Sequence, residues 1–171
     1  MKEFNKVLLL TSVCCMACDG EIAQEEVDLI KMMARKKHLF GDIEIDKELD
    51  ILVNEINIKG KSFLKEYLNI LAENNLTEEE ELQVVDVAVQ TIRADNCIKY
   101  SEIMFFKVIR SNLKVVSDET ILEKIDGIDE NYIAQDICND NLQTYDEYFN
   151  SIELMNFDLS IFNKNATGTD I

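Results

Sequence analysis

The chain has almost nothing in its sequence to interrupt a helix, because it contains no proline and only five glycines in 171 residues. Leucine, isoleucine, glutamate and lysine recur along it at helical spacing. The hydrophobic fraction of 47% is too high for a wholly disordered chain, and the length is enough to bury a sizeable core. We therefore expect an all-α protein.

Stretches with apolar residues at helical spacing predict a helical bundle of about seven helices. They are residues 3–18, 24–38, 46–57, 61–74, 78–94, 100–114 and 118–126. Four of the glycines fall between or just after these stretches, where helices commonly stop. Thr77 followed by Glu80 is a capping box, which predicts a helix start at residue 78. We assign residues 1–127 to one helical domain.

The charge of the chain is acidic and unevenly distributed. With 34 acidic and 17 basic residues the net charge is −17, which repels nucleic acid phosphates and anionic lipids. Residues 117–171 hold 13 acidic and 2 basic residues, a balance of −11, which leaves −6 for the first 116 residues. We therefore expect no nucleic-acid partner and no direct membrane insertion, and we treat residues 128–171 as an acidic C-terminal extension.

The acidic extension also carries apolar residues, so it is more than a solvated tail. Leu154, Phe157 and Ile161 are spaced to follow one helical face. We predict one or two short helices that pack on the domain or await a partner, and a disordered end after about Asn163.

The N-terminal apolar run, residues 7–18, superficially resembles a bacterial lipoprotein signal. Glu3 in the charged region and the absence of a Leu-x-x-Cys arrangement before a cysteine argue against a signal. The run is also too short to span a bilayer. Because it forms part of the internal repeat described below, we predict that it is a core helix.

The cysteines are odd in number, which does not suit a disulfide framework. They are Cys14, Cys15, Cys18, Cys97 and Cys138. Cys15 and Cys18 form a CxxC pair, but a structural zinc site needs a second ligand pair, and His38 is the only histidine. We expect Cys14, Cys15 and Cys18 to be reduced, unmetallated residues that pack one helix face in a cytoplasmic protein.

An internal repeat appears when the sequence is aligned with itself at an offset of 76 residues, which places 16–26 over 92–102. The matched pairs are Asp19 with Asp95, Gly20 with Asn96, Ile22 with Ile98, and Glu26 with Glu102. Glycine and asparagine are the residue types that best tolerate a left-handed backbone. Each copy therefore predicts a helix, a tight turn and a second helix.

The duplicated Asp-(Gly/Asn)-x-Ile-x-x-x-Glu pattern resembles the TerB-like domain, a family named for bacterial tellurite-resistance proteins. It is similar to the N-terminal cytoplasmic domain of a membrane-anchored DnaJ-type co-chaperone. The resemblance covers residues 1–125. It implies a pseudo-twofold arrangement of helix hairpins, an association with tellurite or chemical stress, and no established enzymatic chemistry. The family's acidic positions fall on Asp19, Glu26, Asp95 and Glu102.

The chain departs from the family pattern at both turns. Asn96 stands where the family usually has glycine. The family favours serine after each isoleucine, whereas this chain has Ala23 and Lys99, which are poor N-caps. The resemblance implies nothing about the acidic extension.

The four acids admit two roles. In the structural role, the aspartates accept hydrogen bonds from turn amides, and the glutamates reach back to free amides at the helix starts. In the functional role, carboxylates from both hairpins form an oxygen-rich site for a divalent cation, calcium or magnesium. The sequence favours the structural role, because acids at helix starts commonly act as caps. The two roles are compatible if some oxygens remain free.

Enzymatic motifs find little support in the sequence. His38 ends a Lys36-Lys37-His38 run, so we interpret it as facing the negative end of a helix dipole rather than as a general base. The sequence has no phosphate-binding glycine loop, no HExxH motif and no EF-hand loop.

We therefore expect a cytoplasmic, non-enzymatic TerB-like interaction module in a tellurite or chemical-stress response. Its expected partners are proteins, including membrane-associated stress-response components, and a divalent cation at the paired acidic turns is a further hypothesis. The alternative is a co-chaperone-type adaptor that recruits a protein partner without metal. The third hypothesis is a metal-dependent hydrolase.

Overall fold

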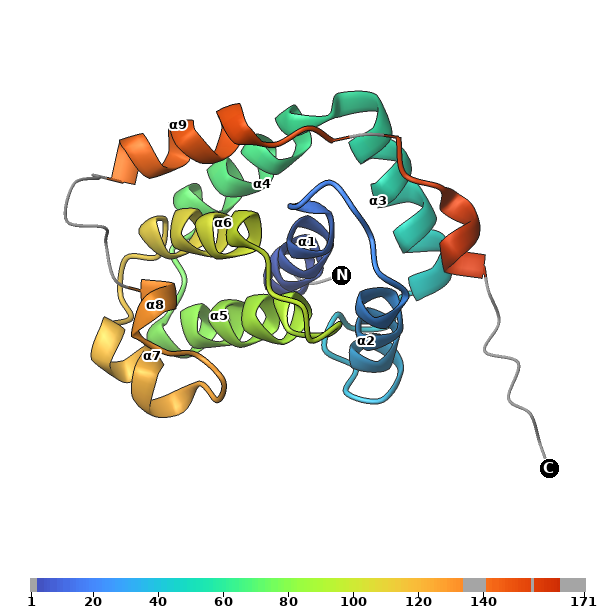
Figure 1. Cartoon of the computed structure of the whole chain (residues 1–171). Coiled ribbons are helices and arrows are strands. Elements are labelled where there is room, and N and C mark those ends of the chain that lie inside the picture. Colours follow the sequence, from blue (N-terminus) through green and yellow to red (C-terminus); the bar gives the residue numbers. More distant parts are fainter. Residues whose placement is uncertain (1–2, 134–140, 155, 164–171) are drawn as a thin grey trace.

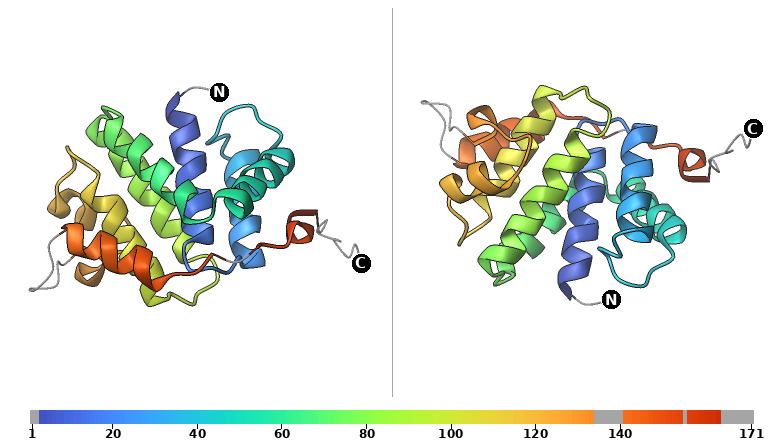
Figure 2. Two further views of the ribbon diagram at one scale, coloured as in Figure 1. Left: turned by 90° about the horizontal axis from the view of Figure 1, so that it is seen from above. Right: turned by 90° about the horizontal axis from the view of Figure 1, so that it is seen from below.

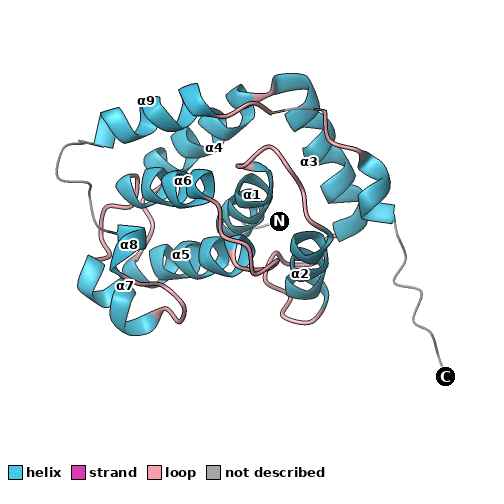
Figure 3. Ribbon diagram, viewed as in Figure 1, coloured by secondary structure: helices cyan, strands magenta, loops and turns pink. Residues whose placement is uncertain are grey.

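The computed structural model describes residues 3–133, 141–154 and 156–163. Within these residues the regular structure is helical, and no strand occurs (Figure 3). The helices are α1 (Glu3–Ala17), α2 (Gln24–Arg35), α3 (Ile45–Lys59), α4 (Lys61–Glu73), α5 (Glu78–Ile92), α6 (Tyr100–Ser111), α7 (Asp118–Lys124), α8 (Glu130–Ile133) and α9 (Asn141–Ser151), followed by the 3-10 helix η1 (Leu159–Asn163). The prediction of an all-α protein is confirmed.

Each of the seven predicted helices is present, but some end earlier than predicted. The second ends at Arg35 instead of residue 38, because the chain turns back to bury Phe40. His38 has a φ of 49° in this turn, and its carbonyl accepts a hydrogen bond from the Gly41 amide at 3.1 Å. His38 therefore lies three residues beyond the end of the helix, and the interpretation that it faces the negative end of the helix dipole stays a prediction.

The helix α6 ends at Ser111 rather than at residue 114, because the Glu81 carboxylate binds the amides that follow it. Oε1 of Glu81 accepts from the amide of residue 114 at 2.7 Å, and Oε2 accepts from those of residues 115 and 116 at 2.9 and 2.7 Å. Glu81 is buried on α5. Its place on the apolar face of that helix, three and four residues before Val84 and Val85, is the sequence signal for this role.

The helix α1 forms the centre of the molecule. Figure 2 shows α1 between α4 and α5 on one side and α2 and α3 on the other, and it contacts all four and α6. Residues 7–17 of α1 are buried all round, and Thr11 donates to the Val7 carbonyl at 2.8 Å as well as bonding the Tyr67 hydroxyl. The apolar N-terminal run is therefore a core helix, as predicted. In the described part of the chain, no helix is both long and apolar enough to cross a membrane.

The cysteines near the end of α1 are buried free thiols. Burial raises the pKa of Cys14, Cys15 and Cys18 well above the ordinary thiol range. Cys18 donates from its thiol to the Cys15 carbonyl at 3.0 Å. Cys97 is an exposed free thiol, and Cys138 lies outside the described residues. The buried thiols are therefore in the un-ionised form that a packed apolar site favours.

The C-terminal part of the chain packs on the helices before it. In Figure 1, α9 lies along α6, and the following segment crosses the top of the molecule to α3, where η1 packs. Tyr148 on α9 is fully buried, its ring centroid lies 5.0 Å from that of Phe105, and its hydroxyl donates to the Cys18 carbonyl at 2.7 Å. Asn57 on α3 exchanges two hydrogen bonds with the backbone of Phe157, at 2.7 and 3.0 Å.

The prediction that apolar residues of the extension pack on the core is confirmed, since Leu154, Phe157 and Ile161 are all partly buried against it. The prediction that they share one helical face is wrong. Leu154 and Phe157 lie in non-helical backbone, and Ile161 lies in η1. At Phe157 the backbone amide and carbonyl bond to the side chain of Asn57 instead of to a helical turn. The predicted disordered end lies outside the described residues.

The candidate site at two acidic turns

The first acidic turn joins α1 to α2. Gly20 has a φ of 86°, and Oδ1 of Asp19 accepts from the Glu21 amide at 2.8 Å. At the start of α2, the N-cap residue Ala23 has no side-chain acceptor, and Oε2 of Glu26 accepts from the Ala23 amide at 2.8 Å instead. Glu26 is thus held at the helix start by an otherwise free amide.

The second acidic turn joins α5 to α6 and has the same hydrogen bonds. Asn96 has a φ of 58°, and Oδ1 of Asp95 accepts from the Cys97 amide at 2.8 Å. Oε2 of Glu102 accepts from the amide of the N-cap residue Lys99 at 2.6 Å. The structural role predicted for the acids is confirmed at both turns.

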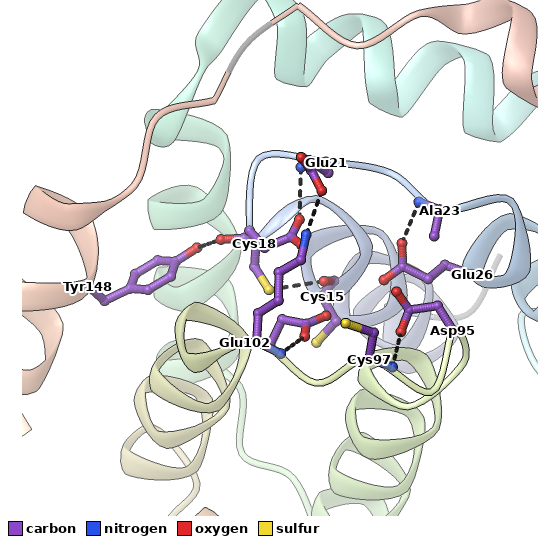
Figure 4. A network of polar contacts seen from close by, with 11 residues as sticks. Cys15, Cys18, Glu21, Ala23, Glu26, Asp95, Cys97, Glu102 and Tyr148 are labelled. Atoms are coloured by element: carbon purple, nitrogen blue, oxygen red, sulfur yellow. Dashed lines mark hydrogen bonds and ion pairs between the residues drawn. The ribbon is translucent and has the colours of Figure 1, made fainter.

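The two turns lie together. Asp19, Glu26 and Asp95 line one small cavity of about 90 Å³, and Lys99 also lines it. Glu102 is close enough for its charge to act on Glu26 (Figure 4). The structure therefore brings together the acids that the sequence singled out from two segments 76 residues apart.

Lys99 is the residue of this site whose role the sequence did not predict. Its Nζ lies 2.6 Å from Oδ2 of Asp19 and 2.5 Å from Oε2 of Glu21, so the second copy of the repeat places an ammonium group on the acids of the first. These two carboxylates raise the pKa of Lys99 well above its usual range. The sequence signal is the difference between the aligned N-cap residues, since the second copy has Lys99 where the first has Ala23. The long lysine side chain can extend away from the N-cap position.

The two glutamates are buried acids, with 5% of Glu26 and 3% of Glu102 exposed. Burial raises the pKa of Glu26 from 4.5 to about 9; the Ala23 amide opposes this shift, and the negative charge of Asp19 adds to it. Burial likewise raises the pKa of Glu102 to about 7 against the lowering effect of the Lys99 amide. Glu26 therefore carries a proton at neutral pH.

The metal hypothesis for Asp19, Glu26, Asp95 and Glu102 stays a prediction. Among the residues that the structure describes, no group of three or more His, Cys, Asp or Glu side chains is arranged so that it could hold a metal ion. One oxygen of each acid accepts from a backbone amide, and the second oxygen of Asp19 lies on Lys99. A bound cation would have to compete with this ammonium group and with the proton on Glu26.

The two turns differ in the space around their left-handed residue, which gives a testable asymmetry. A Cβ on Gly20 would lie 2.6 Å from the Glu153 carbonyl oxygen of the crossing C-terminal segment. We expect Gly20→Asn to lower the free energy of unfolding by about 1–3 kcal/mol, although asparagine tolerates the φ value. The reciprocal change, Asn96→Gly, should cost less than about 1 kcal/mol. Urea denaturation of both variants measures these changes. Equal losses in the free energy of unfolding would contradict the expected clash between a side chain at position 20 and the Glu153 carbonyl oxygen.

The two aspartates that the repeat aligns are not equivalent in the described structure, because the Lys99 ammonium group pairs with Asp19 and not with Asp95. Asparagine at either position keeps the oxygen that accepts the turn amide. We expect Asp95→Asn to change the free energy of unfolding by less than about 0.5 kcal/mol. Asp19→Asn should cost about 1 kcal/mol, since it also removes the ion pair. Chemical denaturation at neutral pH measures both, and a larger loss in Asp95→Asn would refute this order.

Comparison of the chain with protein-family models, with curated proteins and with solved structures finds no significant match.

Proposed function

We propose that this chain is a cytoplasmic, non-enzymatic interaction module of the TerB-like type, which binds a protein partner in a tellurite or chemical-stress response. The observation that carries the proposal is the pair of matched turns. Both copies of the motif have a left-handed residue after the aspartate, an aspartate–amide bond and a glutamate cap, and both reach the same cavity. This arrangement supports the family resemblance of the motif. The buried free thiols support the reducing compartment.

We propose the form of the module that needs no metal. The acids of the motif are occupied by amides, by Lys99 and by the proton on Glu26, so their contacts hold the two hairpins in place. A second form, in which the acids bind calcium or magnesium, is favoured by one observation. Three of the acids line one cavity, where a cation would relieve the repulsion from Asp19 that adds to the effect of burial on the pKa of Glu26.

A pull-down with the tagged full chain as bait, from cells that express it naturally, tests the proposed function. We expect a protein to be enriched over a tag-only control, and to the same extent with and without a chelator. The absence of any enriched protein would contradict the interaction role. Loss of the enriched protein in the chelator arm would contradict the metal-free form and favour the cation-dependent one.

A further inference from the structure

A groove of about 480 Å³ lies between α2 and the C-terminal end of α5, on elements that flank the two turns. Its apolar lining includes Leu29 and Met32, which are partly exposed, and Val89, which is buried. Acidic residues lie on the same surface: Glu25 and Asp28 come from α2, and Asp126 from the turn after α7. We refer to this feature as the α2–α5 groove.

The acids of the α2–α5 groove form no ion pair within the described part of the chain, although Gln24 donates a hydrogen bond to Asp28 at 3.0 Å. None of the ion pairs there involves Glu25, Asp28 or Asp126. Arg93 also lines the groove. Its guanidinium group lies against Gly127 and occupies the space that a Cβ atom on this glycine would need. The groove therefore combines an apolar floor with three carboxylates that form no ion pair in the described chain, against one lining cation, Arg93.

We propose that the α2–α5 groove binds a basic amphipathic helical segment of a protein partner. Apolar side chains of the segment pack on Leu29, Met32 and Val89, and its lysines or arginines pair with Glu25 and Asp28. The chemistry follows from charge complementarity, because acidic partners would meet uncompensated carboxylates and a purely polar segment would leave the floor exposed. This inference rests on the proposed function, since it names the kind of partner that the module takes.

A synthetic peptide supplies a probe that does not depend on the native partner. We suggest a dye-labelled amphipathic helix of about 18 residues, five helical turns, built from leucine and lysine, beside a counterpart in which every lysine is glutamate. Fluorescence anisotropy with the full chain at physiological ionic strength should show saturable binding of the lysine peptide only. No binding of the lysine peptide, or equal binding of both peptides, would overturn the proposal.

Matched variants separate the groove from the general acidity of the chain. Glu25→Gln with Asp28→Asn removes two charges from the groove, and Glu78→Gln with Glu79→Gln removes two exposed charges from the first turn of α5. We expect the groove pair to weaken peptide binding about tenfold and the control pair less than about twofold. Met32→Ser, which leaves the charge unchanged, should also weaken binding. An equal effect of the two charge pairs would mean that net charge alone attracts the peptide and would overturn the inference.

The pull-down separates failure of the groove from failure of the function. If a native partner is enriched equally by the wild type and by the groove pair, the groove inference fails and the interaction module stands. If no partner is enriched at all, the proposed function fails, whereas the peptide titration still decides whether the groove binds basic helices.

Discussion

Replacing Tyr148 by alanine is expected to lower the free energy of unfolding by about 4 kcal/mol. The side chain is fully buried, packs on Phe105 and Phe149, and donates to the Cys18 carbonyl at the end of α1. Its removal leaves a cavity between α9 and α6 and an unpaired buried carbonyl. Tyr148→Phe keeps the ring and should cost only about 1 kcal/mol, the value of the lost hydrogen bond. Urea denaturation measures both losses.

Tyr100→Ala is the matched control, because it removes a tyrosine that is 69% exposed. We expect it to change the free energy of unfolding by less than about 0.5 kcal/mol. If Tyr148→Ala lowers the free energy of unfolding no more than this control does, the packing of α9 on the preceding helices does not stabilise the chain. A chain that ends near Gly127 should also melt at a lower temperature than the full chain, since it lacks Tyr148 and the contacts of Phe157 with Asn57.

The second large effect is a loss of stability as the pH rises. The folded chain raises the pKa of Glu26 from 4.5 to about 9 and that of Glu102 to about 7, so the folded state holds protons that the unfolded state has released. The contribution of these acids is fully present below about pH 4.5 and is lost as the pH rises through their folded pKa values. Each pH unit in this window costs about 1.4 kcal/mol per proton. For one proton, stability should fall by about 3 kcal/mol between about pH 5.5 and about pH 8.

Glu26→Gln isolates this effect from the repulsion among the other acids. Glutamine keeps an oxygen for the Ala23 amide but does not titrate, so its stability should fall less steeply with pH than that of the wild type. Glu79→Gln makes the same substitution at an exposed position and should leave the slope unchanged. Denaturant titrations across this pH range measure the slopes. Equal slopes for the wild type and Glu26→Gln would contradict the buried, protonated state of Glu26.

The helices themselves were predictable because their signals are local. Apolar periodicity located all seven helices of residues 3–124, and the Thr77 capping box located the start of α5. The matched turns were also predictable, because the requirement for φ > 0 restricts Gly20 and Asn96 to residue types that stand out in the sequence.

Contacts between distant segments were not predictable from the sequence. From the sequence alone, Lys99 is only a poor N-cap. In the fold its ammonium group lies beside Asp19, which is 80 residues earlier in the chain. Leu154 and Phe157 have helical spacing, but both lie in non-helical backbone, and the Asn57 side chain binds the amide and carbonyl of Phe157. In both cases hydrogen bonds between distant segments determine the structure, and these bonds cannot be predicted from the local sequence pattern.

We expect the acids of the two turns to be occupied by backbone amides, protons and Lys99 rather than by a divalent cation. Isothermal titration calorimetry of the full chain with calcium and with magnesium at neutral pH measures whether either cation binds. We predict no saturable heat of binding in the wild type for either ion. Saturable binding at one site that is lost in both Asp19→Asn and Asp95→Asn would contradict the claim, because hard cations depend on these anionic oxygens.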